Sequence, residues 1–225
     1  MNGSDIRALE VTSSGVTIKN LTIKNVNYYG SGGAIYFTAS GTVENCNFTD
    51  NKITGDNDGG AVCFNEYSTG IVMNCNFVGN KAPDVNGAGG AVYIARYGTV
   101  TNCNFSNNTA ERRGGAIGGE GECNVINCSF VNNSASSEGG AIWINSGRII
   151  NCNFTNNTVG INGGAIYFGN TGNVENCNFT NNSAVDGGAV YFVSDAEVTN
   201  CNLPGINSLK ILDFAVMLTA LLWVF

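Results

Sequence analysis

The sequence predicts an all-β fold, a single-stranded parallel β-helix (β-solenoid) of about eight coils. A Gly-Gly-Ala-(Ile or Val) motif occurs seven times, and successive copies lie 24 to 30 residues apart. An Asn-Cys-x-(Phe or Leu) motif follows each copy, and the apolar stretches between these motifs are too short for helices. A period in this range is typical of solenoids, in which each repeat contacts only its neighbours and the fold has no single centre.

The two motifs mark successive segments of one coil. The first segment, residues 34–37 and its counterparts, is rich in β-branched and aromatic residues and predicts a strand. In the second segment a flat strand cannot point Val43, Cys46 and Phe48 inward together, so we expect the chain to bend near Asn45. Each coil is therefore predicted to contain three short strands and three bends.

Asparagines recur at two positions of the repeat. Asparagine tolerates the left-handed backbone of tight bends, and stacked side-chain amides hydrogen-bond along a solenoid axis. One series is predicted to form a ladder at a bend, and the other follows each Phe by three residues. The first series is Asn20, Asn45, Asn74, Asn102, Asn127, Asn151, Asn176 and Asn200, and the second is Asn51, Asn80, Asn108, Asn133, Asn157 and Asn182.

Seven of the nine cysteines occupy one position of the repeat, where the first, degenerate repeat has Leu21. We therefore predict buried, free thiols that act as small hydrophobic side chains. No His or carboxylate accompanies them, so neither a metal array nor a cofactor is predicted. They are Cys46, Cys75, Cys103, Cys128, Cys152, Cys177 and Cys201.

Composition excludes several functions. Only 12% of residues are charged, the net charge is −7, and the ten Lys and Arg residues are scattered, which argues against nucleic acid and anionic lipid as partners. The absence of His excludes most metal sites and most general acid–base machinery. Residues 1–5 do not resemble a signal peptide, so we expect either a cytoplasmic protein or, preferably, a piece of a longer secreted chain.

Paired Gly-Gly-Ala-Ile and Phe-x-x-Asn motifs over about residues 14–203 resemble the polymorphic outer membrane protein repeats of chlamydial autotransporters. The Asn-Cys-x-Phe-x-x-Asn-Asn pattern also resembles adhesin-like surface proteins of methanogenic archaea. The resemblance implies a right-handed β-helix outside the cell, acting as an adhesin or surface stalk without catalytic residues. Its partner would be a glycan or protein on the surface of another cell.

Two surfaces are candidates for binding such a partner. The loops at residues 52–58 and 81–88 are longer than their counterparts and carry Asp56, Asp58 and Asp84. These acidic residues could alternatively bind Ca²⁺ or simply be solvated. The second candidate is a stripe of outward aromatic residues, whose alternative role is stacking that stiffens the rod. The stripe is Tyr36, Tyr93, Trp143, Tyr167 and Tyr191.

An enzyme is the alternative function, because pectate lyases and polygalacturonases also have parallel β-helices. Polysaccharide cleavage needs clustered carboxylates with a basic group placed for proton transfer. The candidates here are Asp56, Asp58, Asp84 and Arg96, and the motifs expected of those enzymes are absent.

The repeats predict a β-helix domain over residues 1–203, followed by an apolar tail over residues 204–225. We expect the tail to form a helical cap on the open end of the rod, or to be a truncated hydrophobic segment. Contact with a membrane is expected only through an anchor that this sequence lacks or has in truncated form.

Overall fold

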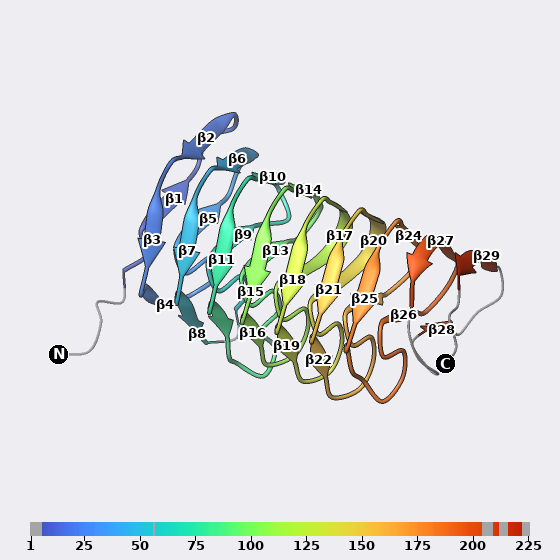
Figure 1. Cartoon of the computed structure of the whole chain (residues 1–225). Helices are drawn as coiled ribbons and strands as arrows, with labels where there is room; N and C mark the ends of the chain where they lie inside the picture. The colour runs from blue at the N-terminus through green and yellow to red at the C-terminus, as the bar shows by residue number, and fades with distance from the viewer. Residues whose placement is uncertain (1–5, 56, 204–208, 212–215, 222–225) are drawn as a thin grey trace.

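The computed structural model describes residues 6–55, 57–203, 209–211 and 216–221, and shows a rod of stacked parallel rungs (Figure 1). Residues at the same position of successive repeats lie side by side, as in the pairs Val43–Val72 and Phe48–Phe77. The predicted parallel β-solenoid is confirmed.

Each complete rung contains up to four strand segments, and equivalent segments stack into four rows. The first row follows the glycine pairs and contains β1 (Leu9–Val11), β5 (Ile35–Phe37), β9 (Val62–Phe64), β13 (Val92–Ile94), the start of β17 (Ile117–Ile126), the start of β20 (Ile142–Ile150), β23 (Ile166–Phe168), β26 (Val190–Phe192) and β28 (Leu209–Ile211). The second row contains β2 (Val16–Lys19), β6 (Gly41–Glu44), β10 (Thr69–Met73), β14 (Tyr97–Thr101), the later parts of β17 and β20, β24 (Gly172–Glu175), β27 (Ala196–Asn202) and β29 (Val216–Leu221).

The third row faces the viewer in Figure 1, and the fourth lies below it. The third row contains β3 (Thr22–Lys24), β7 (Asn47–Thr49), β11 (Asn76–Val78), β15 (Asn104–Ser106), β18 (Ser129–Val131), β21 (Asn153–Thr155) and β25 (Asn178–Thr180). The fourth row is a separate sheet of β4 (Asn27–Tyr29), β8 (Lys52–Thr54), β12 (Lys81–Ala82), β16 (Thr109–Ala110), β19 (Ser134–Ala135) and β22 (Thr158–Val159).

The fourth row corrects the prediction of three strands per coil. Its strands are only two or three residues long, and Ile53, Ala82 and Ala110 form a small core of their own beneath it. The predicted loops at residues 52–58 and 81–88 therefore begin with strand residues, and their irregular parts start after Thr54 and Ala82.

Identical side chains stack along the interior. Val43, Cys46 and Phe48 have no exposed surface, as predicted. The rings from Phe48 to Phe179 form a continuous stack with centroids 4.8–5.0 Å apart, close to the spacing of the rungs. This apolar column is the main core of the rod.

Both predicted asparagine series stack along the rod, but they differ in bonding and environment. Side-chain hydrogen bonds join the first series from Asn74 to Asn151, whereas Asn45 and Asn176 donate to the glutamates before them. The first series has positive φ angles of 52–60° and sits at the bend before each third-row strand. The second series is buried except for the half-buried Asn182. It forms what we call the inner ladder, the residues Asn51, Asn80, Asn108, Asn133, Asn157 and Asn182. Its members donate from one side-chain amide to the next over 2.9–3.0 Å.

The glycine pairs allow the rungs to approach at a further bend. Gly59 has a φ of 71°, and a Cβ atom on Gly60 would collide with the carbonyl oxygen of Gly90 in the next rung. The position therefore requires glycine.

The seven repeated cysteines are free and at most 3% exposed. Each thiol lies 3.1–3.2 Å from the carbonyl oxygen two residues earlier, as Cys75 does to Met73. Burial raises the pKa of the Cys46 thiol, and it raises that of Cys123, outside the series, to about 12. The predicted role as inward hydrophobic residues agrees with this placement.

The described part of the tail corrects the predicted helical cap. β28 pairs with β26 and β29 pairs with β27, so the tail adds strands to the first and second rows. The remaining tail positions, including much of the predicted truncated segment, lie outside the described residues. Within the described residues, no helix has the length and apolar character needed to span a membrane.

Candidate functional site

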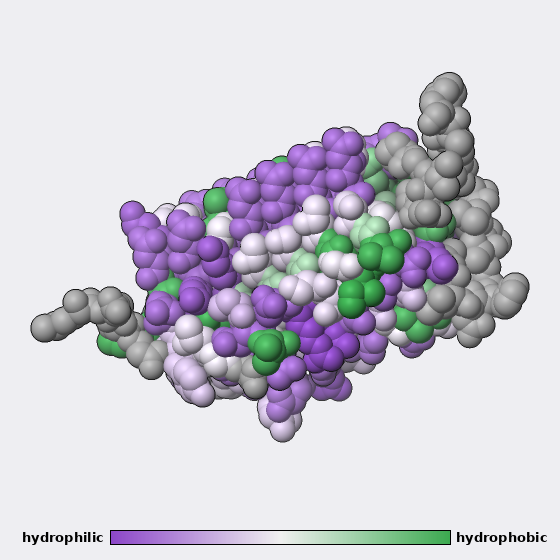
Figure 2. Space-filling model, turned by 90° about the horizontal axis from the view of Figure 1, so that it is seen from below, coloured by the Kyte–Doolittle hydropathy of each residue, from purple (hydrophilic) through white to green (hydrophobic). Residues whose placement is uncertain are grey.

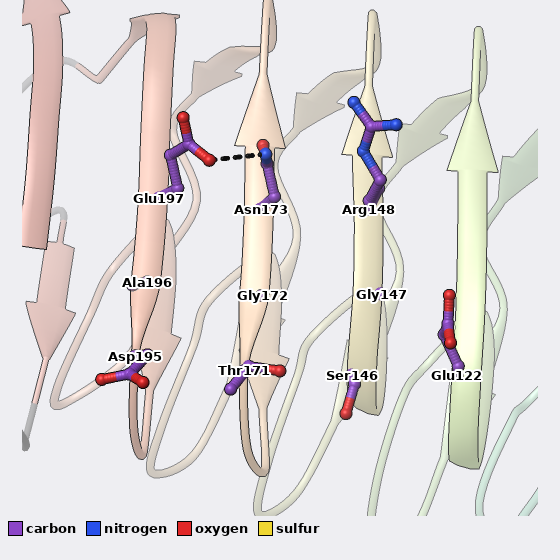
Figure 3. Close-up of a pocket in the computed structure, with 10 residues that line it drawn as sticks. All are labelled: Glu122, Ser146, Gly147, Arg148, Thr171, Gly172, Asn173, Asp195, Ala196 and Glu197. Atoms are coloured by element: carbon purple, nitrogen blue, oxygen red, sulfur yellow. Dashed lines mark hydrogen bonds between the residues drawn. The ribbon is translucent and has the colours of Figure 1, made fainter. Parts of the chain in front are cut away.

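A groove of about 570 Å³ crosses four rungs on the outer side of the second row (Figure 3). Glu122 lies on one flank, Asp195 and Glu197 lie on the other, and Arg148 and Asn173 stand on the strands between them. The other lining residues are Ser146, Gly147, Thr171, Gly172 and Ala196. Three carboxylates and one guanidinium give the lining an acidic balance.

The groove coincides with a shortened bend. In β20 only Asn145 and Ser146 separate Ile144 of the first row from Gly147 of the second. Three residues occupy this bend in the rungs on either side, and the pairing of β17 with β20 shifts register there. Ser146 of this short bend and the glycine after it, Gly147, line the groove.

Hydrogen bonds hold part of the lining in place. Asn173 donates from Nδ2 to Oε2 of Glu197 over 3.0 Å, and the backbone N–H of Arg148 donates to Oδ1 of Asn124 over 3.1 Å. The Arg148 guanidinium is 3.6 Å from the Glu175 carboxylate, and both side chains are solvent-accessible, so this ion pair restrains it only weakly. Arg148 is therefore able to turn toward a ligand.

One acceptor in the groove lacks a partner. The Oδ1 atom of Asn173 is shielded from solvent, and no described residue donates to it. A carboxylate only accepts hydrogen bonds, so the amide atom that faces Glu197 is Nδ2 and the unpaired atom is the oxygen Oδ1. A buried acceptor without a donor costs about 1–3 kcal/mol, which a hydroxyl or amine from a ligand would recover.

The predicted acidic loops lie away from this groove, and no described hydrogen bond or ion pair joins Asp58 to Asp84. Asp58 is half-buried and accepts from the backbone N–H of Ala88 over 2.9 Å. Burial raises the pKa of Asp58 to about 6, and the nearby Glu120 adds to the shift while the Ala88 N–H opposes it. These contacts tie Asp58 to the next rung.

The other loop candidates have different surroundings. Asp84 is half-buried, and its Oδ2 atom has no partner among the described residues. Arg96 is exposed and stacks over Tyr97 at 5.3 Å from the ring centroid. Asp56 lies outside the described residues. The catalytic and calcium hypotheses both include Asp56, so their complete sets of residues cannot be compared with the structure.

The aromatic stripe was expected to be exposed, and the structure corrects this. Tyr93, Trp143 and Tyr191 are only 6–7% exposed, and Tyr36 and Tyr167 are half-buried. At two positions the residue before a glycine pair lies beside the stripe and covers it. Ala88 packs against Tyr93, and the Arg113 guanidinium lies 4.6 Å from the Trp143 ring centroid.

The stripe instead forms contacts along the rod. Arg113 is held by an ion pair to Glu138 at 2.6 Å, and the rings of Tyr167 and Tyr191 stack with centroids 5.2 Å apart. Burial raises the pKa of Tyr167 to about 12. This arrangement matches the stiffening role that the sequence left open as the alternative.

Sequence reasoning missed every residue of the groove. The signal was present in the bend lengths, because Asn145 and Ser146 fill the shortest bend between first-row and second-row positions. The lining residues themselves form no motif, since they are outward positions on four different rungs.

Comparison with known proteins gives two matches. A family model described as "Right handed beta helix region" matches residues 7–182, and one described as a Chlamydia polymorphic membrane protein repeat matches residues 176–193. No curated protein and no solved structure matches the sequence. The second match bears out the predicted resemblance to the chlamydial repeat over one copy of the repeat. Because the first match spans most of the 225 residues and agrees with the stacked parallel rungs, the chain belongs to the family of right-handed β-helix regions.

Proposed function

We propose that the chain is a stalk of an adhesin-like protein on the outside of the cell, and that it binds a surface glycan without cleaving it. The right-handed β-helix and the match to a polymorphic membrane protein repeat support a surface role. The continuous ladders of Phe, Cys and Asn support a stiff rod, because each rung repeats the contacts of the last. The resemblance of the repeat sequence to adhesin-like proteins of methanogens is part of this proposal.

The groove is the proposed glycan site, and the unpaired Oδ1 of Asn173 is the observation that carries it. Because Oδ1 is shielded from solvent, a sugar hydroxyl reaches it once the Asn173 side chain turns outward, at the cost of the donation from Nδ2 to Glu197. Ser146 and Thr171 add hydroxyl groups to the lining. The predicted loops with Asp56, Asp58 and Asp84 remain the alternative binding surface.

A binding assay on immobilised glycans tests the site. Asn173→Ala removes the unpaired acceptor and is expected to weaken binding about tenfold, the effect of roughly 1.4 kcal/mol. Thr99→Ala is the matched control, because Thr99 occupies the same column three rungs before Asn173 and lies outside the groove. It should leave binding unchanged.

Two outcomes would move the site elsewhere. If Asn173→Ala binds normally while trimming residues 55–58 and 83–88 abolishes binding, the loops are the site. If the chain captures a protein from another cell and no glycan, the partner class is wrong.

A glycan-cleaving enzyme is the second candidate, because Glu122, Asp195 and Glu197 bring three carboxylates into one groove with Arg148. Carboxylates flanking a glycosidic bond are the usual groups for its hydrolysis. Release of soluble products from a polysaccharide panel, with loss of that release in both Asp195→Asn and Glu197→Gln, would establish this function. Retained binding without any product supports the stalk.

A further inference from the structure

From β7 onward, an uncharged array made mostly of amides and hydroxyls, with two valines, covers the outer side of the third row. We call it the amide face, and it consists of three columns of outward residues. The first column is Asn45, Asn74, Asn102, Asn127, Asn151, Asn176 and Asn200; the second is Asn47, Asn76, Asn104, Ser129, Asn153, Asn178 and Asn202; the third is Thr49, Val78, Ser106, Val131, Thr155 and Thr180.

The asparagines of the face are exposed, and hydrogen bonds hold many of them in ladders. In the second column Asn76 donates to Asn47 over 2.8 Å, and Asn104 donates to Asn76 over 2.9 Å. First-column amides are joined over 3.2–3.3 Å. Figure 2 shows hydrophilic groups stacked in regular rows along one edge of the rod, as such ladders require.

Backbone requirements explain the first column but not the second. First-column residues have positive φ angles, a conformation that favours Asn. Second-column residues lie within strands, where Asn is disfavoured relative to Thr or Val. The chain nevertheless has Asn at this position in most rungs. We infer that the position requires the side-chain amide rather than a backbone conformation.

The ladders leave hydrogen-bonding capacity free at the surface. A side-chain amide offers two donors and an oxygen with two lone pairs. A ladder contact uses one donor and one lone pair of each internal member, such as Asn76, so one of each remains for an external partner. Because the ladder already fixes the rotamer, a partner that binds these groups loses little additional side-chain entropy.

We propose that the amide face binds the surface of an insoluble, neutral polysaccharide. Sugar hydroxyls donate and accept at once, which matches the free donor and acceptor of each amide. From β7 onward the three columns contain no charged residue in a chain of net charge −7. Lys24 of β3 continues the third column, and Asn45 and Asn176 donate to Glu44 and Glu175 beside the first, so the charges lie at the edges of a neutral face.

The size of the face favours a solid over a soluble partner. With rungs about 4.8 Å apart and residues about 3.3 Å apart, seven rungs by five residues cover roughly 550 Å². This is about two thirds of what each partner contributes to a stable protein interface. A polysaccharide surface offers many equivalent contacts to one rod and to neighbouring rods, so avidity compensates for the weak individual contacts. The face shares no residue with the groove, so its test is independent of the glycan site proposed there.

Co-sedimentation with microcrystalline cellulose tests this proposal. The main variant combines Asn76→Val, Asn104→Val, Asn153→Val and Asn178→Val, which keep strand propensity and remove second-column amides. We expect the fraction bound to fall at least about tenfold, because several weak contacts are lost together. Soluble cello-oligosaccharide at equal sugar concentration should not displace the wild-type protein.

The matched control replaces four exposed asparagines at the next bend, Asn107, Asn132, Asn156 and Asn181, by Gly. Glycine keeps their positive φ, so binding should stay within about twofold of wild type. Thermal unfolding of every variant checks folding, and the pair Asn104→Ala with Asn153→Ala replaces the quadruple variant if that one does not fold. Unchanged cellulose binding in a folded amide-face variant overturns the proposal. So does wild-type protein that ignores cellulose but self-associates in solution through the same face.

Discussion

The inner ladder and the amide face contain the same residue type at the same spacing, yet their amides are used differently. Asn108 of the inner ladder is fully buried and donates from Nδ2 to the Phe77 carbonyl and to Oδ1 of Asn133, each over 3.0 Å. Its own Oδ1 accepts both the backbone and side-chain N–H of Asn80. The side chain of Asn76, on the amide face, is exposed, and among the described residues it makes only its two ladder contacts.

The difference shows that burial, rather than stacking, decides what an asparagine ladder does. In the interior every donor and acceptor must be matched, because an unmatched one is expensive away from water. At the surface water serves any group the ladder leaves free, so the ladder contributes little to stability and its spare groups stay available for a partner.

The largest expected effect is the loss of an inner-ladder amide. Asn133→Ala leaves the backbone N–H of Asn108 without an acceptor, takes one of the two acceptors from its Nδ2, and removes a donor from the Phe105 carbonyl. At about 1–3 kcal/mol for each unmatched buried group, we expect a loss of about 3–6 kcal/mol in unfolding free energy. Denaturant unfolding measures it. A loss below about 1 kcal/mol would mean that water enters the interior and would remove the contrast between the two ladders.

The second largest effect is expected at Asp58, whose partly buried carboxyl tests how burial affects a charged group. The folded pKa of Asp58 is about 6, above the value of about 3.9 expected when unfolded, so the folded state holds the proton more tightly. Stability should therefore fall as the pH rises from about 4 to about 6. Asp58→Asn keeps an acceptor for the Ala88 N–H and should raise the unfolding free energy at pH 7 by about 2 kcal/mol.

The pH profile of unfolding provides the decisive measurement for Asp58. In Asp58→Asn, the unfolding free energy should no longer fall between about pH 4 and 6. Asp50→Asn, on the same rung, is the control and should change stability by less than about 0.5 kcal/mol. A variant that keeps the full profile would show that other groups produce it.

The bend asparagines test the backbone contribution apart from the amide. Asn151 has a φ of 54°, so Asn151→Ala is expected to cost about 1–2 kcal/mol. Asn151→Gly removes the same amide, but glycine adopts a positive φ without strain. Its unfolding free energy, measured by thermal unfolding, should therefore lie within a few tenths of a kcal/mol of the wild-type value. Equal losses in both variants would assign the cost to the amide ladder.

The smallest effect is expected on the amide face. Asn104→Ala removes an exposed side chain whose contacts water can replace, so the unfolding free energy should change by less than about 0.5 kcal/mol. Calorimetry of this variant beside Asn133→Ala compares the two ladders directly. A loss of several kcal/mol would show that the face is primarily structural and would weaken the case for a ligand there.

Much of the rod was predictable because stacking repeats each requirement in every rung. Left-handed bends at Asn45 and its counterparts, and the inward positions of Cys46 and Phe48, recur often enough to stand out. The fourth row was missed because a segment such as Lys81–Ala82 carries one small buried side chain and no periodic pattern.

The sites were far less predictable, because they depend on what covers or recesses a position. Trp143 points outward as expected, yet Arg113 from another segment covers its ring. The groove lies where the bend of β20 is one residue shorter than its neighbours, and a motif defined by residue type does not detect a difference in length. In the tail, apolar composition suggested a helix, whereas pairing with β27 makes Val216–Leu221 a strand.

The inner ladder also gives the rod a polarity. Its side-chain amides are all oriented alike, with Nδ2 donating toward the rung that follows in sequence, from Asn51 through Asn157. Their dipoles therefore add along the axis instead of cancelling. Each rung of the inner ladder therefore presents donors to the rung after it and acceptors to the rung before it. A duplicated rung should fit between two others in the same orientation, and a reversed rung should not. Such a chain can change its length in whole rungs, by duplication or deletion, without designing a new interface.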